Sequence, residues 1–167
     1  MTSPLSQPPV VFRATVEPEW IDRNGHFNAG YYVVVFDTAL MPWLDTFELT
    51  TEYRQQHGVT TFTAENHVTY LRELHEGAPL EISAQLLAHD RKRIHSFFRM
   101  RHATEGFLAA TCEVLSLFVD ARARRVSPMP DEVVARVERI GRDHATLPWP
   151  SQAGRAISIA ARPPARE

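Results

Sequence analysis

The stretch WIDRNGHFN, residues 20–28, stands directly before AGYYVVVFDTAL, residues 29–40. The first stretch combines a carboxylate, two amides, an imidazole and a glycine, and it reads as a loop because Asp, Asn and Gly favour turns. In the second stretch three consecutive valines favour a strand, whereas its length, unbroken until Pro42, favours a helix. Asn28 is a suitable N-cap, so we expect a central helix over residues 29–44, buried on nearly every face and bent or ended near Met41-Pro42.

Alternating apolar residues on either side of this helix predict a sheet. The expected strands cover residues 10–16, 59–74, 80–88, 94–102 and 107–119, with turns at residues 76–79, 89–92 and 104–106. These turns are short, so we expect antiparallel neighbours, and the strand over residues 107–119 is apolar on both faces and belongs inside the sheet. Two helices complete the pattern: a short one around Tyr53–His57, and a last one from Asp131 that stops at Gly141.

The predicted fold class is α+β, one curved antiparallel sheet wrapped around one long central helix. We expect a flexible N-terminus over residues 1–9, one domain over residues 10–141 and a peripheral or disordered tail over residues 142–167. An open sheet has edge strands, and pairing with a second copy is a common way to cover them. A homodimer or a dimer of dimers is therefore expected.

Composition excludes several classes of partner. The 167 residues carry a net charge of −2 with both signs interspersed, which indicates neither nucleic acid nor an anionic membrane as a partner. No apolar stretch approaches the roughly 18 residues of a membrane span, and the first residues resemble no signal peptide. With Cys112 as the only cysteine and the histidines scattered, we expect a cytoplasmic protein without a disulfide or metal site, acting on a small neutral or amphiphilic molecule.

The loop and helix carry a family resemblance. Asp22-x-Asn24-Gly25-His26-x-Asn28 before an aromatic-rich helix resembles the hotdog-fold acyl-CoA thioesterases, in particular the 4-hydroxybenzoyl-CoA thioesterase-like branch. Residues 65–73, ENHVTYLRE, look like the second strand of that family, and residues 119–130 look like its closing turn. Within the family, the stretch from Pro18 to Asn28 is most similar to the betainyl-CoA thioesterases of carnitine degradation.

The resemblance implies that the chain hydrolyses a short acyl-CoA, with betainyl-CoA as the candidate substrate, at a site between the subunits of a homodimer. Asp22 then acts as nucleophile or as base for water, with His26 and Asn28 as further catalytic candidates. The N–H groups near Gly30 and Tyr31, at the helix N-terminus, would stabilise the developing oxyanion. No cofactor is implied, since coenzyme A is part of the substrate, and its thiolate leaves without a strong acid.

The residues themselves leave purely structural roles open as alternatives. Asp22 with Asn24-Gly25 is a common turn sequence, His26 can simply order the loop, and Asn28 can simply cap the helix. An aromatic cage is a physical means of holding a trimethylammonium group. The aromatic candidates for the acyl pocket, with ordinary core packing as their alternative role, are Trp20, Phe27, Tyr31, Tyr32 and Trp43. Glu65 is a candidate second carboxylate or an ordinary strand residue.

Coenzyme A carries phosphates that need basic partners. Arg91-Lys92-Arg93, at a predicted hairpin turn, is a candidate, although such a run is usually a solvated face. Two other functions stay open at this point: a hotdog enoyl-CoA hydratase, which the Asp22 and His26 pair loosely resembles, and a non-catalytic acyl-CoA-binding module.

Overall fold

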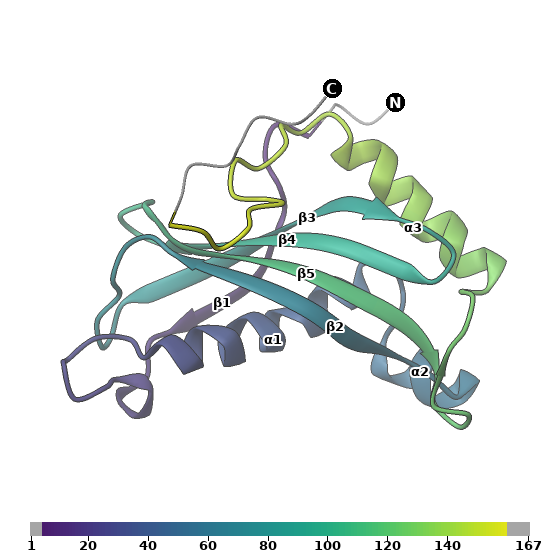
Figure 1. Cartoon of the computed structure of the whole chain (residues 1–167), viewed down its shortest axis with the longest axis horizontal. Coiled ribbons are helices and arrows are strands. Elements are labelled where there is room, and N and C mark those ends of the chain that lie inside the picture. The colour runs from purple at the N-terminus through teal and green to yellow at the C-terminus, as the bar shows by residue number, and fades with distance from the viewer. Residues whose placement is uncertain (1–4, 160–167) are drawn as a thin grey trace.

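The computed structural model describes residues 5–159 and shows a curled antiparallel sheet arching over helix α1 (Ala29–Asp45) (Figure 1). The strands are β1 (Val10–Thr15), β2 (Val59–Tyr70), β3 (Pro79–His89), β4 (Arg93–His102), β5 (Leu108–Asp120) and β6 (Arg125–Val126). The remaining helical elements are the 3-10 turn η1 (Pro18–Trp20), α2 (Thr51–His57) and α3 (Asp131–His144). The predicted α+β architecture, a curved antiparallel sheet wrapped around one long helix, is confirmed.

The sheet has the strand order β1-β3-β4-β5-β2, with β6 added to β5. The predicted hairpins β3–β4 and β4–β5 are confirmed, and β5 lies inside the sheet between β4 and β2. The prediction that β2 and β3 form a hairpin is wrong. β2 pairs with β5, whereas β3 pairs with β1 near the opposite edge of the sheet. Residues 71–78 instead cross from one edge of the sheet to the other at the end where the loop before α1 lies.

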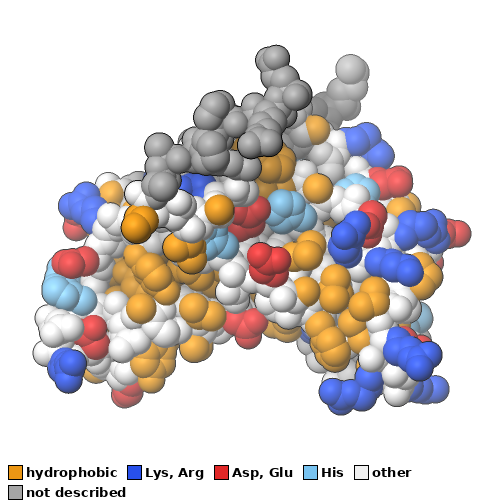
Figure 2. Space-filling view, in the orientation of Figure 1, with side chains coloured by type: hydrophobic (Ala, Val, Ile, Leu, Met, Phe, Trp, Pro, Cys, Tyr) orange, Lys and Arg blue, Asp and Glu red, His pale blue; other side chains and the backbone are white. Residues whose placement is uncertain are grey.

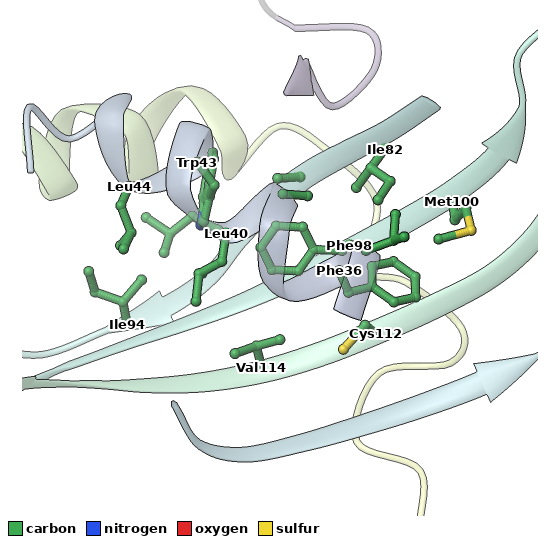
Figure 3. Close-up of a cluster of buried hydrophobic side chains, with 14 of the residues drawn as sticks. Phe36, Leu40, Trp43, Leu44, Ile82, Ile94, Phe98, Met100, Cys112 and Val114 are labelled. Carbon is green, nitrogen blue, oxygen red and sulfur yellow. The ribbon is translucent and has the colours of Figure 1, made fainter. Parts of the chain in front are cut away.

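The core lies between α1 and the concave face of the sheet. Phe36, Leu40, Trp43 and Leu44 point from α1 toward a layer from β3, β4 and β5 that is formed by Ile82, Ile94, Phe98, Met100, Cys112 and Val114 (Figure 3). Side chains alternate between the faces of a strand, so every second residue of these strands belongs to this layer. This packing fixes the orientation of α1, and therefore where its N-terminus lies.

Two expectations about α1 are wrong. The helix neither ends at Pro42 nor is buried all round, since it continues to Asp45 while Val34 and Met41 are exposed. Proline removes one hydrogen bond, and the complete burial of Trp43 and Leu44 just after it offsets that loss. The sheet covers only one side of α1, so the opposite stripe stays open in a single chain.

The last helix is longer than predicted. It runs past Gly141 to His144, whose side chain is buried and whose Nδ1 accepts the N–H of Leu86 in β3 at 2.9 Å. The Gly141 Cα packs closely against β3, since a Cβ there would lie 3.4 Å from His89 Nε2. Tertiary contacts therefore override the stop signal of the glycine.

Residues 145–159 follow the face of the sheet opposite α1, where the Gly154 N–H donates to Glu113 Oε2 at 2.7 Å. The predicted flexible N-terminus and tail lie partly outside the described residues, at 1–4 and 160–167. Within residues 5–159 no helix is long and apolar enough to cross a membrane.

Among the described residues, β2 pairs with a strand on one side only and forms an edge of the sheet. Exposed apolar side chains lie on or just after it, namely Phe62, Tyr70 and Leu71. Figure 2 shows hydrophobic side chains gathered in two patches over the ends of this edge.

Candidate active site

The loop before α1 is a closed turn held by its own backbone. Ile21 and Phe27 form an antiparallel bridge, and the Asp22 N–H donates to the His26 carbonyl at 2.9 Å. Gly25, with φ of 80°, donates its N–H to the Asp22 carbonyl at 2.9 Å. A residue with a side chain rarely adopts such a left-handed conformation, which explains the glycine at this point of the turn. The turn therefore holds Asp22 and His26 side by side.

The two oxygens of the Asp22 carboxylate have different surroundings. Oδ1 accepts the N–H of Asn24 at 2.8 Å and that of His26 at 3.4 Å, which is the turn geometry typical of Asp. No hydrogen bond to Oδ2 is found within residues 5–159, and Asp22 lines a cavity. The turn therefore orients the carboxylate through one oxygen and leaves the other available for chemistry.

At the start of α1, the N–H groups without an acceptor are not the ones expected from the sequence. Asn28 caps the helix, since its Oδ1 accepts the Gly30 N–H at 2.8 Å and its carbonyl accepts the Tyr31 N–H at 2.9 Å. Both N–H groups predicted to face an oxyanion therefore already have acceptors. Ala29, the first helical residue, has no acceptor for its N–H within residues 5–159, and it lines the same cavity as Asp22.

This cavity has a volume of about 340 Å³, at the small end for a ligand site. Its walls come from the loop, the start of α1, the end of β2 and the crossing segment, through Asp22, His26, Phe27, Ala29, Tyr32, Tyr70, Leu71, Arg72 and Glu73. The Tyr70 hydroxyl donates to the Ala29 carbonyl at 3.0 Å and ties β2 to the helix N-terminus. Burial raises the pKa of Tyr32 to about 12, so that phenol stays protonated.

The crossing segment 71–78 is hydrogen-bonded to the loop before α1. The Phe27 N–H donates to the Leu74 carbonyl at 3.0 Å, and His75 Nδ1 lies 3.4 Å from the Gly25 carbonyl. His26 Nε2 lies 3.2 Å from Glu73 Oε2, which places the imidazole at the rim of the cavity. His26 thus has a partner of its own, as the loop-ordering alternative expects.

Of the predicted pocket aromatics, Phe27 and Tyr32 line the cavity. Trp20 stacks on Phe27 at 5.7 Å and on Tyr31 at 6.3 Å between ring centroids, but neither Trp20 nor Tyr31 is part of the wall. Trp43 is about 20 Å farther along the helix, fully buried, where its Nε1–H donates to Ser96 Oγ at 2.8 Å. The structure therefore does not bring Trp43 to the site.

Glu65 and the basic run also lie elsewhere. Glu65 is on the face of β2 opposite the core and lines a separate cavity of about 640 Å³ beside Glu113. Arg91, Lys92 and Arg93 form the β3–β4 turn at the opposite end of the sheet from Asp22, about 30 Å along β3. Arg91 pairs with Asp131 at 2.6 Å, and Arg93 Nε donates to Asp90 at 2.7 Å.

Sequence reasoning missed five members of the cavity wall: Ala29, Tyr70, Leu71, Arg72 and Glu73. The motif Tyr70-Leu71-Arg72-Glu73 closes the stretch that resembles the family's second strand, but strand periodicity does not indicate that its end meets the helix N-terminus. Within residues 5–159, no group of three or more His, Cys, Asp or Glu side chains could hold a metal ion. Cys112 is buried in the core, which raises its pKa to about 12 and leaves it a poor nucleophile.

The chain is similar to known proteins in sequence and in fold. Residues 16–137 match the family model of the thioesterase-like superfamily. A betainyl-CoA thioesterase of Pseudomonas aeruginosa is 36% identical over 162 residues, which cover 97% of this chain and 100% of that protein. An L-carnitine dehydrogenase/betainyl-CoA thioesterase of Rhizobium meliloti is also 36% identical, over 85% of this chain but only 28% of its own length.

A solved structure shows the same fold. A hypothetical protein from Staphylococcus aureus, in complex with CoA, superposes with a TM-score of 0.84 at 28% identity. The superposition covers 95% of this chain and 100% of that chain.

Proposed function

Because this chain belongs to the thioesterase-like superfamily, we propose that Asp22 and the N-terminus of α1 form the site at which it hydrolyses acyl-CoA thioesters. The chain is a thioester hydrolase with the hotdog fold. The single observation that carries the proposal for the site is the Asp22 carboxylate, oriented through Oδ1, lining the same cavity as the first N–H of α1.

The mechanism follows from which donors and acceptors of the site have no hydrogen-bond partner within residues 5–159. The thioester carbonyl oxygen would accept the Ala29 N–H, where the helix dipole also favours negative charge. The free oxygen of Asp22 then attacks the carbonyl carbon or removes a proton from an attacking water. The C–S bond breaks and the electron pair leaves on the thiolate of CoA, whose low basicity makes a strong acid unnecessary. Where Asp22 is the nucleophile, this leaves a mixed anhydride, which a water then hydrolyses to the free acid and the restored Asp22 carboxylate. Asn28 contributes by capping α1, and His26 by ordering the turn.

The acyl group we propose is small and carries a trimethylammonium end, as in betainyl-CoA. The relative from Pseudomonas aeruginosa bears that name and aligns over its whole length. The small, aromatic-walled cavity supports a short acyl group rather than a long chain. A cytoplasmic location, where CoA esters are made and used, belongs to the same proposal.

We further propose a homodimer, or a dimer of dimers, that pairs along β2. This strand offers an edge of 12 residues, and the exposed Phe62 and Leu71 would be covered by a second copy, while Tyr70 would keep its ring toward the cavity. The cavity opens beside the C-terminal end of that edge, so the site would lie at the subunit interface. Sedimentation analysis tests this, since a fully active monomer would contradict it.

Antiparallel pairing of two β2 strands has a consequence for CoA. It would bring the β3–β4 turn of the second copy to the end of the sheet where Asp22 of the first copy lies. The cations of Arg91 and Arg93 already have carboxylate partners, so Lys92 is the residue of this turn most available to a CoA phosphate. If so, Lys92→Ala raises KM for CoA esters and leaves kcat unchanged.

The test is thiol release from a panel of acyl-CoA esters, namely betainyl-, acetyl-, 4-hydroxybenzoyl- and medium-chain CoA, for the wild type beside Asp22→Asn. We expect hydrolysis to be fastest with betainyl-CoA and to be lost in the variant. Hydration of an enoyl-CoA without thiol release would instead favour a hydratase. CoA-ester binding without any turnover would favour the binding module.

A further inference from the structure

The cavity beside Asp22 has walls suited to a cation as well as to a thioester. In a betaine-like acyl group the quaternary nitrogen is separated from the carbonyl carbon by a single methylene. Whatever binds that nitrogen must therefore line the same cavity as Asp22. Tyr32, Tyr70 and Glu73 do so, whereas Trp20 and Tyr31 do not.

The two tyrosine rings form a rigid corner. They meet edge to face, with an interplanar angle of 86° and 5.3 Å between their centroids, and Phe27 stacks behind Tyr32 at 4.1 Å. Tyr32 is only 4% exposed and cannot move, whereas Tyr70 is 50% exposed and offers ring surface to a ligand. The bond from the Tyr70 hydroxyl to the Ala29 carbonyl holds the Tyr70 ring in place. A fixed aromatic surface next to the reacting carbonyl is what a trimethylammonium group, which cannot donate a hydrogen bond, requires.

The charges around the cavity favour a cation. Glu73 adds a second carboxylate to that of Asp22. The positive Arg72 lies over the Phe107 ring, at 3.8 Å from its centroid, and faces Glu105 at 4.0 Å, in the neighbouring cavity of about 690 Å³. His26, the remaining basic group, is paired with Glu73 at 3.2 Å. The cavity thus holds two carboxylates while its one permanent cation is held against another ring.

We infer that Tyr70, backed by Tyr32 and assisted by Glu73, binds the quaternary ammonium end of the acyl group and so selects a cationic substrate over a neutral one of the same shape. This inference rests on the proposed thioesterase function of the Asp22 site. It assigns the cation to the end of β2 rather than to the rings of Trp20 and Tyr31, which stack on each other and are not part of the cavity wall.

The test compares two substrates that differ only in charge. Betainyl-CoA is set against tert-butylacetyl-CoA, in which a carbon atom replaces the nitrogen, and the charge preference is the ratio of their kcat/KM values. The variants are Tyr70→Leu, which removes the ring, Tyr70→Phe, which keeps the ring and removes the hydroxyl, and Glu73→Gln. Tyr31→Leu is the matched aromatic control on α1, because its ring lies outside the cavity.

We expect the wild type to prefer betainyl-CoA and Tyr70→Leu to lower the charge preference by about tenfold, the loss of one cation–π partner. Hydrolysis of tert-butylacetyl-CoA by the same variant then reports that the protein is folded and the catalytic centre intact. Tyr70→Phe should keep the preference within about twofold because the ring face remains. Glu73→Gln should lower it by about two- to fivefold, as expected for a largely exposed carboxylate.

Three results overturn the inference. They are an equal fall in both kcat/KM values for Tyr70→Leu, a fall in the preference for Tyr31→Leu but not for Tyr70→Leu, and a wild type that cleaves both esters equally. In each of these the thioesterase function stands. If the wild type cleaves neither ester nor any other member of the acyl-CoA panel, the proposed function itself has failed.

Discussion

Asp22 orders its turn and is the proposed catalytic carboxylate, and two substitutions separate these two roles. Its Oδ1 accepts the N–H groups of Asn24 and His26, whereas its second oxygen has no hydrogen bond within residues 5–159, and Asp22 lines the cavity. Asp22→Asn keeps an oxygen that can accept both N–H groups but removes the negative charge. Asp22→Ala removes the acceptor as well. Asp22→Ala should therefore lose both the order of the turn and catalysis, whereas Asp22→Asn should lose catalysis alone.

The structure sets the expected magnitudes. Asp22→Ala loses one good hydrogen bond of 2.8 Å and one long bond of 3.4 Å, so the free energy of unfolding should fall by about 1 to 2 kcal/mol. Asp22→Asn should cost about 0.5 kcal/mol or less, because only the charge of the acceptor is lost. In both variants kcat should fall by about 10² to 10⁴, which corresponds to about 3 to 5 kcal/mol of activation free energy.

The two quantities need two assays on the same preparations. Thiol release from betainyl-CoA gives kcat, and urea denaturation followed by circular dichroism gives the free energy of unfolding. Two results together would refute the reasoning. They are a near wild-type kcat for Asp22→Asn, and a loss of activity in Asp22→Ala that is no larger than the unfolded fraction of that variant explains. Asp22 would then serve the turn alone, and the catalytic carboxylate would have to be sought elsewhere, with Glu73 the other acid of the cavity.

Three further predictions concern the framework. Phe98→Ala should lower the free energy of unfolding by about 3 to 5 kcal/mol in urea denaturation, because Phe98 is fully buried. Gly141→Ala should raise it by about 0.5 to 1 kcal/mol, since a Cβ inside α3 meets its neighbours only at ordinary contact distances; a loss of stability would show that the helix cannot accommodate the methyl group. Burial lowers the pKa of His144, so as pH falls below about 6.5 the unfolded chain binds the proton first and stability is lost by up to about 1.4 kcal/mol per pH unit. His144→Asn, which retains an acceptor for the Leu86 N–H, should flatten this slope in denaturation curves measured between about pH 7 and 5, whereas His57→Asn, at an exposed position, should not.

Local signals were sufficient for most of the fold. The period of apolar residues placed the five long strands and the start of α1, since each of these is determined by neighbours within one segment. The errors occur where contacts distant in sequence decide. Gly141 does not stop α3, because His144 is bound to β3, and Pro42 does not end α1, because the two residues after it are buried.

The pairing of β2 was predictable only in part. A short, polar connection containing Gly77 looks like a hairpin turn, and nothing in its composition distinguishes it from a segment that crosses the end of the sheet. The crossing is instead determined by partners far away, since the Val16 carbonyl accepts the Gly77 N–H at 2.9 Å and the Leu74 carbonyl accepts the Phe27 N–H at 3.0 Å. For this reason the sequence indicated the loop residues of the site but not Tyr70 and Glu73, which the crossing brings to it.

The loop before α1 is rich in polar groups, but its own hydrogen bonds leave few of them for a substrate. Asn28 uses its side chain and carbonyl on Gly30 and Tyr31, and Asp22 uses one oxygen on its own turn. What remains without a hydrogen-bond partner within residues 5–159 is one oxygen of Asp22 and the N–H of Ala29, on two residues that line one small cavity and that we propose as base or nucleophile and as oxyanion donor. A group with no partner is costly when buried but is available to a substrate when it faces a cavity. The motif therefore owes its chemistry less to the number of its polar residues than to the two groups that its own hydrogen bonds leave unused.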